Sequence, residues 1–408
     1  MEHKSENGSE SLSERSDFKQ YEREQKRHKK MITFTIVICT IAAVALFVYI
    51  LNSVVNKYYT EFEVLVATPR KDSNSVQYKE YAEGVLKFSS DGAAGIDAKG
   101  NILWNGSYDM NNPQADVCGQ YVVIGDIGGK EWYIYNGKDS GTRFEETLSV
   151  VQVQVSQQGI VAVMLEDKDS NEIHIYNPYG DAQTLLAEIP TNVTEDGYPM
   201  DISISDDGKK LVTVYFCVND GVGESRVSFY NFDEIGKDKV NRIVGGVEYG
   251  ETLVHNVEFI DNNTMCILME NGFALYSMEE LPEEIITESI EQEIRSVVLG
   301  SSGVGFVLDS DEEGWQEFVL YHLTGKKMLS KKIDYEYETV SMIGEEIVFL
   351  SDLEGIILRN TGSEKFHYRF FKRMEYIFGT NEKNTYIFVD EANIEKVKLT
   401  GATRDGNN

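Results

Sequence analysis

Histidines are the first residues in this sequence that could support metal or acid–base chemistry. There are six histidines among 408 residues, and the four beyond residue 30 stand apart from one another: His174, His255, His322 and His367. A hydrolytic zinc site needs ligands at fixed spacings such as His-Glu-x-x-His, and no such spacing occurs. His174 and His322 hold similar places in the segments EIHIY and LYHL. We expect structural histidines there, and the sequence gives no support to zinc-dependent hydrolysis.

One acidic stretch could in principle bind calcium. Residues 167–172, DKDSNE, follow the first half of the calcium-loop pattern Asp-x-Asp-x-Asn. That loop needs glycine at its sixth position and an acid at its twelfth, where this chain has Glu172 and Pro178. Residues 309–314, DSDEEG, occupy the equivalent place in another unit of the repeat described below. Both stretches are therefore expected to be polar hairpin turns.

Nucleophile and phosphate motifs are also missing from the sequence. The glycine-rich segment GSSGVG, residues 300–305, precedes a predicted strand, whereas a phosphate cradle needs the start of a helix. No Gly-x-Ser-x-Gly motif occurs, and pairs of acids are so abundant in this chain that no single pair is informative. The sequence predicts no catalytic residue, no cofactor-binding residue, no metal ligand and no cofactor.

The cysteines have no motif spacing. Cys39 lies in a long apolar run, which leaves Cys118, Cys217 and Cys266 for the rest of the chain. An odd number of widely spaced cysteines without a Cys-x-x-Cys pair is a poor match to a disulfide framework or a cysteine zinc site. Three buried free thiols are the favoured interpretation, and one disulfide with one free thiol is the alternative.

Charge limits the possible partners. The formal net charge is −30 and the sequence pI is about 4.6. Binding to nucleic acid requires clustered Lys and Arg, and such clusters do not occur beyond residue 30. We therefore expect no nucleic-acid partner.

The apolar run Met31–Leu51 contains no charged residue. As a helix, its 21 residues would extend about 31 Å, which matches the hydrocarbon core of a bilayer. Residues 19–30 contain six Lys or Arg and two Glu, whereas residues 52–64 contain one Lys. This bias predicts a cytoplasmic N-terminus and an external C-terminal part. A cleaved signal peptide is a weaker interpretation, because the run is long and no clear Ala-x-Ala site follows it.

The rest of the chain consists of short apolar strands in a repeated phrase. Residues 201–216, DISISDDGKKLVTVYF, give an apolar strand, a turn and a second strongly apolar strand. Looser copies begin near residues 85, 116, 150, 254, 295, 339 and 374, and a third and a fourth strand usually follow. Four antiparallel strands per unit at roughly 40-residue spacing are typical of a β-propeller. The predicted fold is all-β, a closed propeller with eight blades favoured and seven possible, preceded by a single transmembrane helix.

The expected organisation follows from these patterns. Residues 1–30 form a disordered cytoplasmic tail and residues 31–51 the transmembrane helix. Residues 52–80 form a linker in which EFEVLVA, 61–67, is a candidate for the strand that closes the ring. The propeller is expected over residues 81–402, followed by a disordered tail, 403–408.

Two segments and the overall layout resemble known families. DAKGNILWN, residues 97–105, resembles the repeat of quinoprotein-type propellers, and SDDGKKL, residues 205–211, looks like the strand turn of many propellers. The layout is similar to a family of membrane-anchored Gram-positive proteins of unknown function. That resemblance implies a location and a fold, and it implies no activity.

The favoured function is an extracytoplasmic scaffold at the bacterial cell membrane that binds a protein or cell-wall partner. One alternative is an enzyme, either quinoprotein-like or carbohydrate-active. A second alternative is a sensor that signals through a cytoplasmic partner.

Overall fold

The computed structural model describes residues 10–401 except 56, 71, 73, 74, 169, 181–183, 195, 311 and 313. The chain has two compact units, a helical unit up to Lys57 and a second unit that begins at Tyr58. The expected disordered tail at residues 403–408 lies outside the described residues, as do residues 1–9.

The first unit is a single helix, α1 (Glu10–Val55). Its segment Gln25–Phe47 has a mean hydropathy of 2.2 over 23 residues, and no part of it is buried. It is long and apolar enough to cross a membrane, a criterion that a signal sequence near the N-terminus would also meet. The helix also includes residues 10–30, for which disorder was expected. Adding turns to an existing helix is far easier than nucleating one, and Glu, Lys, Arg and Gln are good helix formers.

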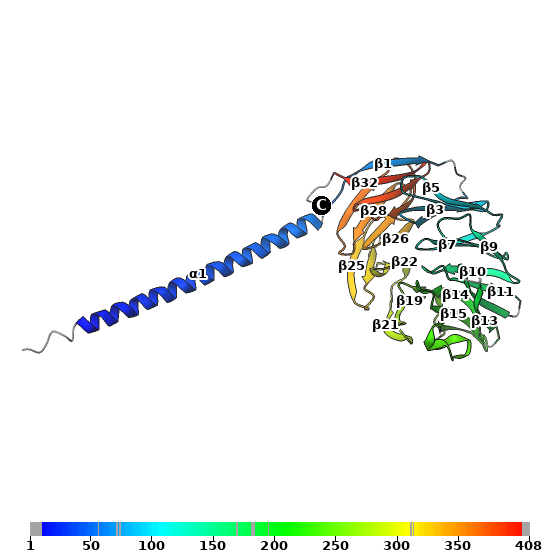
Figure 1. The fold of residues 1–408 in the computed structure, drawn as a ribbon, viewed down its shortest axis with the longest axis horizontal. Helices are drawn as coiled ribbons and strands as arrows, with labels where there is room; N and C mark the ends of the chain where they lie inside the picture. Colours follow the sequence, from blue (N-terminus) through cyan, green and yellow to red (C-terminus); the bar gives the residue numbers. More distant parts are fainter. Residues whose placement is uncertain are drawn as a thin grey trace, which may run out of the picture. The chain divides into compact units, whose positions relative to one another are not determined.

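The second unit is a closed propeller of eight four-stranded antiparallel sheets arranged around a ring (Figure 1). The first four blades comprise β2 (Gln77–Tyr81), β3 (Gly84–Ser89), β4 (Gly92–Ile96) and β5 (Ile102–Ser107); β6 (Pro113–Cys118), β7 (Tyr121–Asp126), β8 (Glu131–Tyr135) and β9 (Thr142–Glu145); β10 (Ser149–Val155), β11 (Val161–Glu166), β12 (Ser170–Asn177) and β13 (Thr184–Asn192); and β14 (Tyr198–Ile204), β15 (Lys210–Asn219), β16 (Val222–Asn231) and β17 (Ile243–Gly250).

The other four blades complete the ring. They comprise β18 (Val254–Phe259), β19 (Thr264–Met269), β20 (Gly272–Ser277) and β21 (Glu283–Ser289); β22 (Ile294–Gly300), β23 (Gly303–Asp309), β24 (Gln316–Tyr321) and β25 (Lys327–Ile333); β26 (Thr339–Ile343), β27 (Glu346–Leu350), β28 (Glu354–Arg359) and β29 (Glu364–Arg369); and β30 (Met374–Gly379), β31 (Thr385–Asp390), β32 (Asn393–Thr400) and β1 (Glu61–Pro69). Two short 3-10 helices, Glu234–Gly236 and Val240–Arg242, connect β16 to β17.

The N-terminal strand closes the ring. β1 pairs antiparallel with β32, with Glu61 opposite Thr400 and Pro69 opposite Asn393. In Figure 1 the blue β1 therefore lies beside the red β32. This is the strand expected at residues 61–67, and it is the outermost strand of the eighth blade. This pairing covers the edge of β32 that would otherwise be open and gives the eighth blade its fourth strand.

The eight-bladed fold is confirmed, and one strand was missed. β2, with the sequence QYKEY, is the innermost strand of the first blade and lies mostly within the expected linker. Tyr78 and Tyr81 are buried, whereas Lys79 and Glu80 are exposed. The charged pair makes this strand resemble a polar linker, which is why the sequence predicted a linker over residues 52–80.

The core lies between the blades. Eight clusters of buried hydrophobic side chains occur in the described chain, and each draws its residues from two neighbouring blades. Each sheet therefore buries both faces, which explains why second strands such as Val161–Glu166 are apolar almost throughout. Trp104 of the first blade illustrates the packing: its ring stacks on Tyr135 of the second blade, with centroids 4.3 Å apart.

Candidate functional site

The innermost strands of the blades carry polar side chains that reach their neighbours. Asp116 on β6 accepts a hydrogen bond from the backbone N–H of Val155 on β10, at 2.8 Å. Asp201 on β14 accepts hydrogen bonds from the backbone N–H of Val257 and the amide of Asn256 on β18, both at 2.8 Å. An innermost strand has one edge without a strand partner, so these carboxylates satisfy N–H groups that would otherwise need water.

Neutral side chains on the innermost strands also accept hydrogen bonds from backbone N–H groups of the next blade. Gln152 and Gln154 on β10 accept hydrogen bonds from the backbone N–H groups of Ile202 and Ile204 on β14, each at 3.1 Å. The hydroxyl of Ser203 accepts one from the N–H of Phe259 at 2.9 Å. Much of the polarity of these inner strands is therefore structural, because it links β6, β10, β14 and β18 in succession.

Two acids on inner strands, Asp116 and Asp201, act electrostatically on a third, Glu258. Burial raises the pKa of Asp201 to about 6. Burial also raises the pKa of Glu258, on β18, to about 7, and the charges of Asp116 and Asp201 add to this rise while Lys79 on β2 opposes it. Solvent reaches the Glu258 side chain, yet protein surrounds it closely enough to weaken its hydration. The centre of the ring is thus an electronegative region suited to a proton or a cation.

A second cluster lies on the outer strands of the third blade. His174 on β12 is buried, and its Nε2 lies 3.0 Å from Oε2 of Glu172. Its Nδ1 lies 3.3 Å from Oε2 of Glu146 and 3.3 Å from the hydroxyl of Tyr176. Burial lowers the pKa of His174, but hydrogen bonds and charges from Glu146 and Glu172 outweigh this effect and the pKa is raised overall.

This second cluster meets the geometric requirement for a metal site. Each of Glu172, His174 and Glu188 offers one ligand atom, and these atoms all lie within 4.8 Å of one another. Among the residues that the structure describes, this is the group that satisfies that condition. The central acids Asp116, Asp201 and Glu258 do not form such a group. His174 was expected to be an isolated structural histidine, and no metal ligand was predicted from the sequence.

The other histidines lie apart from this cluster. His174 and His322 were expected to hold equivalent strand positions, but His322 follows the end of β24 and is exposed in a turn. There its Nδ1 accepts a hydrogen bond from the backbone N–H of Thr324 at 3.1 Å. His367 Nε2 lies 2.6 Å from Oε1 of Glu354 on the neighbouring strand.

The acidic and glycine-rich stretches form strand connections. Asp167 donates its backbone N–H to the carbonyl of Ser170 at 2.9 Å in the turn before β12. Residues 310–315, of which 311 and 313 lie outside the described part, connect β23 to β24. Ser301 and Ser302, in the glycine-rich segment, form the turn between β22 and β23.

The cysteines are all free thiols. Cys266 is fully buried, whereas Cys118 and Cys217 are half-buried and Cys39 is exposed on α1. The Cys118 thiol donates a hydrogen bond to Asp206 at 3.3 Å, and burial together with the charge of Asp206 raises the pKa of this thiol. A thiol with a raised pKa is a poor nucleophile, so the geometry does not favour cysteine chemistry at this position.

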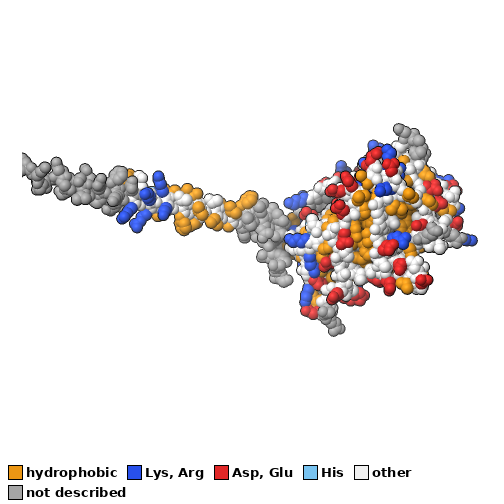
Figure 2. Space-filling model, turned by 90° about the horizontal axis from the view of Figure 1, so that it is seen from below, with side chains coloured by type: hydrophobic (Ala, Val, Ile, Leu, Met, Phe, Trp, Pro, Cys, Tyr) orange, Lys and Arg blue, Asp and Glu red, His pale blue; other side chains and the backbone are white. Residues whose placement is uncertain are grey.

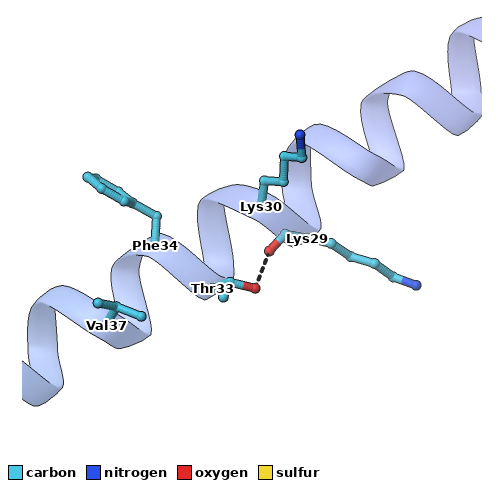
Figure 3. A pocket seen from close by; sticks show the side chains of 5 residues that line it. All are labelled: Lys29, Lys30, Thr33, Phe34 and Val37. Carbon is cyan, nitrogen blue, oxygen red and sulfur yellow. Dashed lines mark hydrogen bonds between the residues drawn. The ribbon is translucent and has the colours of Figure 1, made fainter.

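One hollow lies on α1. It is lined by Lys29, Lys30, Thr33, Phe34 and Val37. Figure 3 shows that these side chains spread outward from one helix, so the hollow has no opposite wall. It is therefore not a built binding site, although it marks where the basic part of the helix gives way to the apolar part.

The comparison with protein families covers nearly the whole propeller. The model of DUF5711, described as a family of unknown function, matches residues 55–399. The chain belongs to this family. A search of curated proteins finds no match to the DUF5711 chain.

Solved structures resemble the DUF5711 propeller at low sequence identity. One is Chaetomium thermophilum Sqt1 bound to the N-terminus of the ribosomal protein L10, with 10% identity and a TM-score of 0.53; the match covers 83% of this chain and 100% of that chain. Another is the computationally designed Ika8 protein, with 10% identity and a TM-score of 0.49; the match covers 84% of this chain and 100% of that chain. At this identity the likeness to Sqt1 shows the fold alone.

Proposed function

We propose that this protein is a single-pass membrane protein whose propeller lies outside the cytoplasm and serves as a binding platform. The observation that carries the proposal is an unburied apolar segment, Gln25–Phe47, in the helix that precedes a closed propeller. A soluble protein would bury so apolar a surface, whereas a bilayer accommodates it directly.

The hydroxyl groups in the apolar segment support a bilayer setting. Thr33, Thr35 and Thr40 each donate a hydrogen bond of 2.9 Å to the backbone carbonyl four residues earlier. The first of these bonds, to the carbonyl of Lys29, is drawn in Figure 3. A hydroxyl bonded to its own helix needs no water, so it can lie in hydrocarbon without an unsatisfied polar group.

The charge pattern of the helix supports an orientation. Figure 2 shows Lys and Arg side chains gathered immediately before the hydrophobic stretch. Residues 19–30 contain six Lys or Arg. The positive-inside rule places such a segment in the cytoplasm, and the propeller then follows on the other side.

The two faces of the propeller differ in charge. One face of the propeller carries the connections between the first and second strands and between the third and fourth strands of each blade. The chain enters β1 at this face, and we call it the linker face. The opposite face carries the connections between second and third strands and between successive blades, and we call it the acidic face. Among the described residues, the connections on the acidic face contain 17 Asp or Glu and 5 Lys or Arg. The connections on the linker face, counted together with residues 57–60, contain 13 Asp or Glu and 9 Lys or Arg. A strongly acidic face favours a cationic partner.

Exposed hydrophobic side chains occur on the acidic face as well. Phe371 is 95% exposed, Leu353 is 42% exposed and Trp315 is 40% exposed, and all three lie in its connections. Aromatic side chains such as Phe371 and Trp315 are enriched at protein interfaces relative to the rest of the protein surface. The fold is also compatible with this role, since the Sqt1 propeller binds the N-terminus of the ribosomal protein L10.

Topology can be tested by cysteine labelling in intact cells. Val240→Cys introduces a thiol at a side chain that is 82% exposed on the propeller, and Tyr21→Cys introduces one on the basic part of α1, where the side chain is 59% exposed. A membrane-impermeant maleimide should label Val240→Cys in intact cells, whereas it should label Tyr21→Cys only after the cells are permeabilised. The unsubstituted protein measures labelling of the native cysteines. The opposite pattern would overturn the orientation.

Partner binding can be tested by charge reversal on the two faces. Glu336→Lys with Glu338→Lys changes exposed acids on the acidic face, and Glu279→Lys with Glu280→Lys makes the matched change on the linker face. After cross-linking in intact cells, we expect the acidic-face variant alone to lose the co-purified protein. Equal recovery with both variants, or no specific partner with the unsubstituted protein, would contradict the proposed platform.

A further inference from the structure

We propose that Glu172, His174 and Glu188 form a zinc-binding site on the outer strands of the third blade. This proposal is independent of the membrane topology and of the partner proposed above. It rests on the register of two strands, on the groups that orient His174, and on the balance of charge around it.

Strand geometry brings the three ligands together. β12 and β13 are antiparallel, and His174 lies directly opposite Glu188. Glu172 precedes His174 by two residues on β12, so its side chain points to the same face of the sheet. Directly opposite residues on one face have β-carbons about 5 Å apart, which suits shared coordination of one ion.

The buried side of the imidazole is already oriented for metal binding. Nδ1 of His174 faces Glu146, which is 8% exposed and accepts a hydrogen bond from the indole N–H of Trp132 at 3.0 Å. If Nδ1–H donates to this carboxylate, Nε2 presents a lone pair toward Glu172 and Glu188. Metal-binding histidines almost always have such a second partner, because it fixes the tautomer and the ring orientation.

Distances agree with this arrangement. Zinc lies about 2.0–2.2 Å from nitrogen and carboxylate oxygen ligands, so two ligand atoms on one ion lie about 3–3.5 Å apart. The separation of Nε2 of His174 from Oε2 of Glu172 is 3.0 Å, and all three ligand atoms lie within 4.8 Å of one another. Small side-chain rotations of the two glutamates would complete the contacts. Three protein ligands would leave the fourth position of a tetrahedral ion for water.

A protonated imidazole paired with carboxylates is the competing interpretation. Three glutamates, at positions 146, 172 and 188, surround one histidine. None of them forms an ion pair with a lysine or arginine within the described part of the chain. One proton on His174 would leave two negative charges in excess, whereas a divalent ion bound to the neutral ring would leave one. The charge balance therefore favours the ion.

Zinc titration of the full-length protein in detergent tests the proposal. After treatment with EDTA, titration with zinc chloride should show one tight site, and magnesium and calcium chloride should not compete for it. Glu188→Gln should weaken zinc binding by at least tenfold, because amide oxygen is a far weaker zinc ligand than carboxylate. Glu188 is exposed, so this variant should fold normally. Glu283→Gln, at an exposed acid of the outermost strand of the fifth blade, is the matched control and should bind zinc unchanged.

A spectroscopic readout distinguishes this site from binding to scattered surface acids. Cobalt(II) bound at a four-coordinate site gives intense visible absorption, which should appear in the unsubstituted protein and be lost in Glu188→Gln and His174→Gln. Zinc binding of equal strength in Glu188→Gln and in the control, or binding of several weak equivalents without the cobalt spectrum, would overturn the proposal. Absence of zinc binding to the folded, unsubstituted protein would overturn it as well.

Discussion

The ring of Phe62, on β1, meets the ring of Phe388, on β31, edge to face with centroids 5.3 Å apart. Phe62 also lies 5.1 Å from the ring of Tyr368, on β29 of the seventh blade. A residue near the start of the propeller therefore packs against two blades made from its C-terminal end. This contact ties the closure of the ring to side-chain packing as well as to strand pairing.

Phe62→Ala should destabilise the propeller by about 2–4 kcal/mol, since the half-buried ring leaves a cavity among four aromatic neighbours. Leu65→Ala on the same strand is the control, because Leu65 is 43% exposed and its loss should cost less than 1 kcal/mol. Thermal unfolding measures both variants. Equal effects would mean that β1 contributes through backbone pairing alone.

Gly208→Val should destabilise the propeller by about 1–3 kcal/mol. Gly208 has φ +69°, and a β-carbon there would lie 2.6 Å from Cγ1 of Ile160 in the neighbouring blade. Two causes act at Gly208, the positive φ and the steric crowding. Gly221→Val separates them, because Gly221 has φ +83° but no atom lies within 4 Å of its added β-carbon. The Gly208 variant should have the lower melting temperature; the same melting temperature for both would exclude a contribution from crowding.

The free energy of unfolding of the propeller should increase as the pH falls from 8 to 6, and protonation of Glu258 should contribute to this increase. The pKa of this carboxyl is raised to about 7 in the folded protein, so the folded state binds a proton that the unfolded state does not yet bind. Because solvent reaches and screens the group, we expect its contribution to be about 1 kcal/mol. Asp201, with its pKa raised to about 6, acts in the same direction.

Glu258→Gln should remove this contribution and raise the stability at pH 8. The side chain makes no hydrogen bond to other described residues, so the amide replaces it without breaking one. Glu279→Gln, at an exposed acid, should keep the pH dependence of the unsubstituted protein. Melting temperatures at pH 6, 7 and 8 provide the comparison. If the melting temperature of Glu258→Gln changes with pH as in the unsubstituted protein, the other central groups account for the pH dependence.

Trp104→Phe should lower the free energy of unfolding of the propeller by about 1–2 kcal/mol. The indole N–H donates a hydrogen bond to the hydroxyl of Tyr81 at 2.9 Å, and the ring stacks on Tyr135. Phenylalanine retains part of the stacking and loses the donor. Trp315→Phe serves as the control, because Trp315 is 40% exposed and should tolerate the change within about 0.5 kcal/mol. A melting temperature for Trp104→Phe that matches the control would contradict a role for this hydrogen bond.

Most of the fold could be predicted because the blade pattern is local. A turn between two apolar strands is visible in the residues themselves, as in SDDGKKL, where Gly208 supplies the positive φ of the turn. β2 could not be recognised in this way. Its two buried tyrosines are separated by the adjacent exposed residues Lys79 and Glu80, so the strand lacks the strict alternation of a half-buried strand and also fits a polar linker.

The cluster around His174 was missed for a different reason. Its members come from β12, from β13 and from the connection after β9, and the register between strands brings them together. Glu172 was considered as a mismatch to a calcium loop. The alternation Glu-x-His on a strand was the one local sign that both side chains share a face.

The use of β1 as the last strand of the eighth blade also sets an order of events during synthesis. β1 leaves the ribosome more than 300 residues before β32, the strand it must join. Throughout that interval the growing chain holds an unpaired strand at one end and an incomplete sheet at the other. A product that stops short of β32 keeps both exposed, and it should be recognised by quality-control proteases or pair wrongly with another chain.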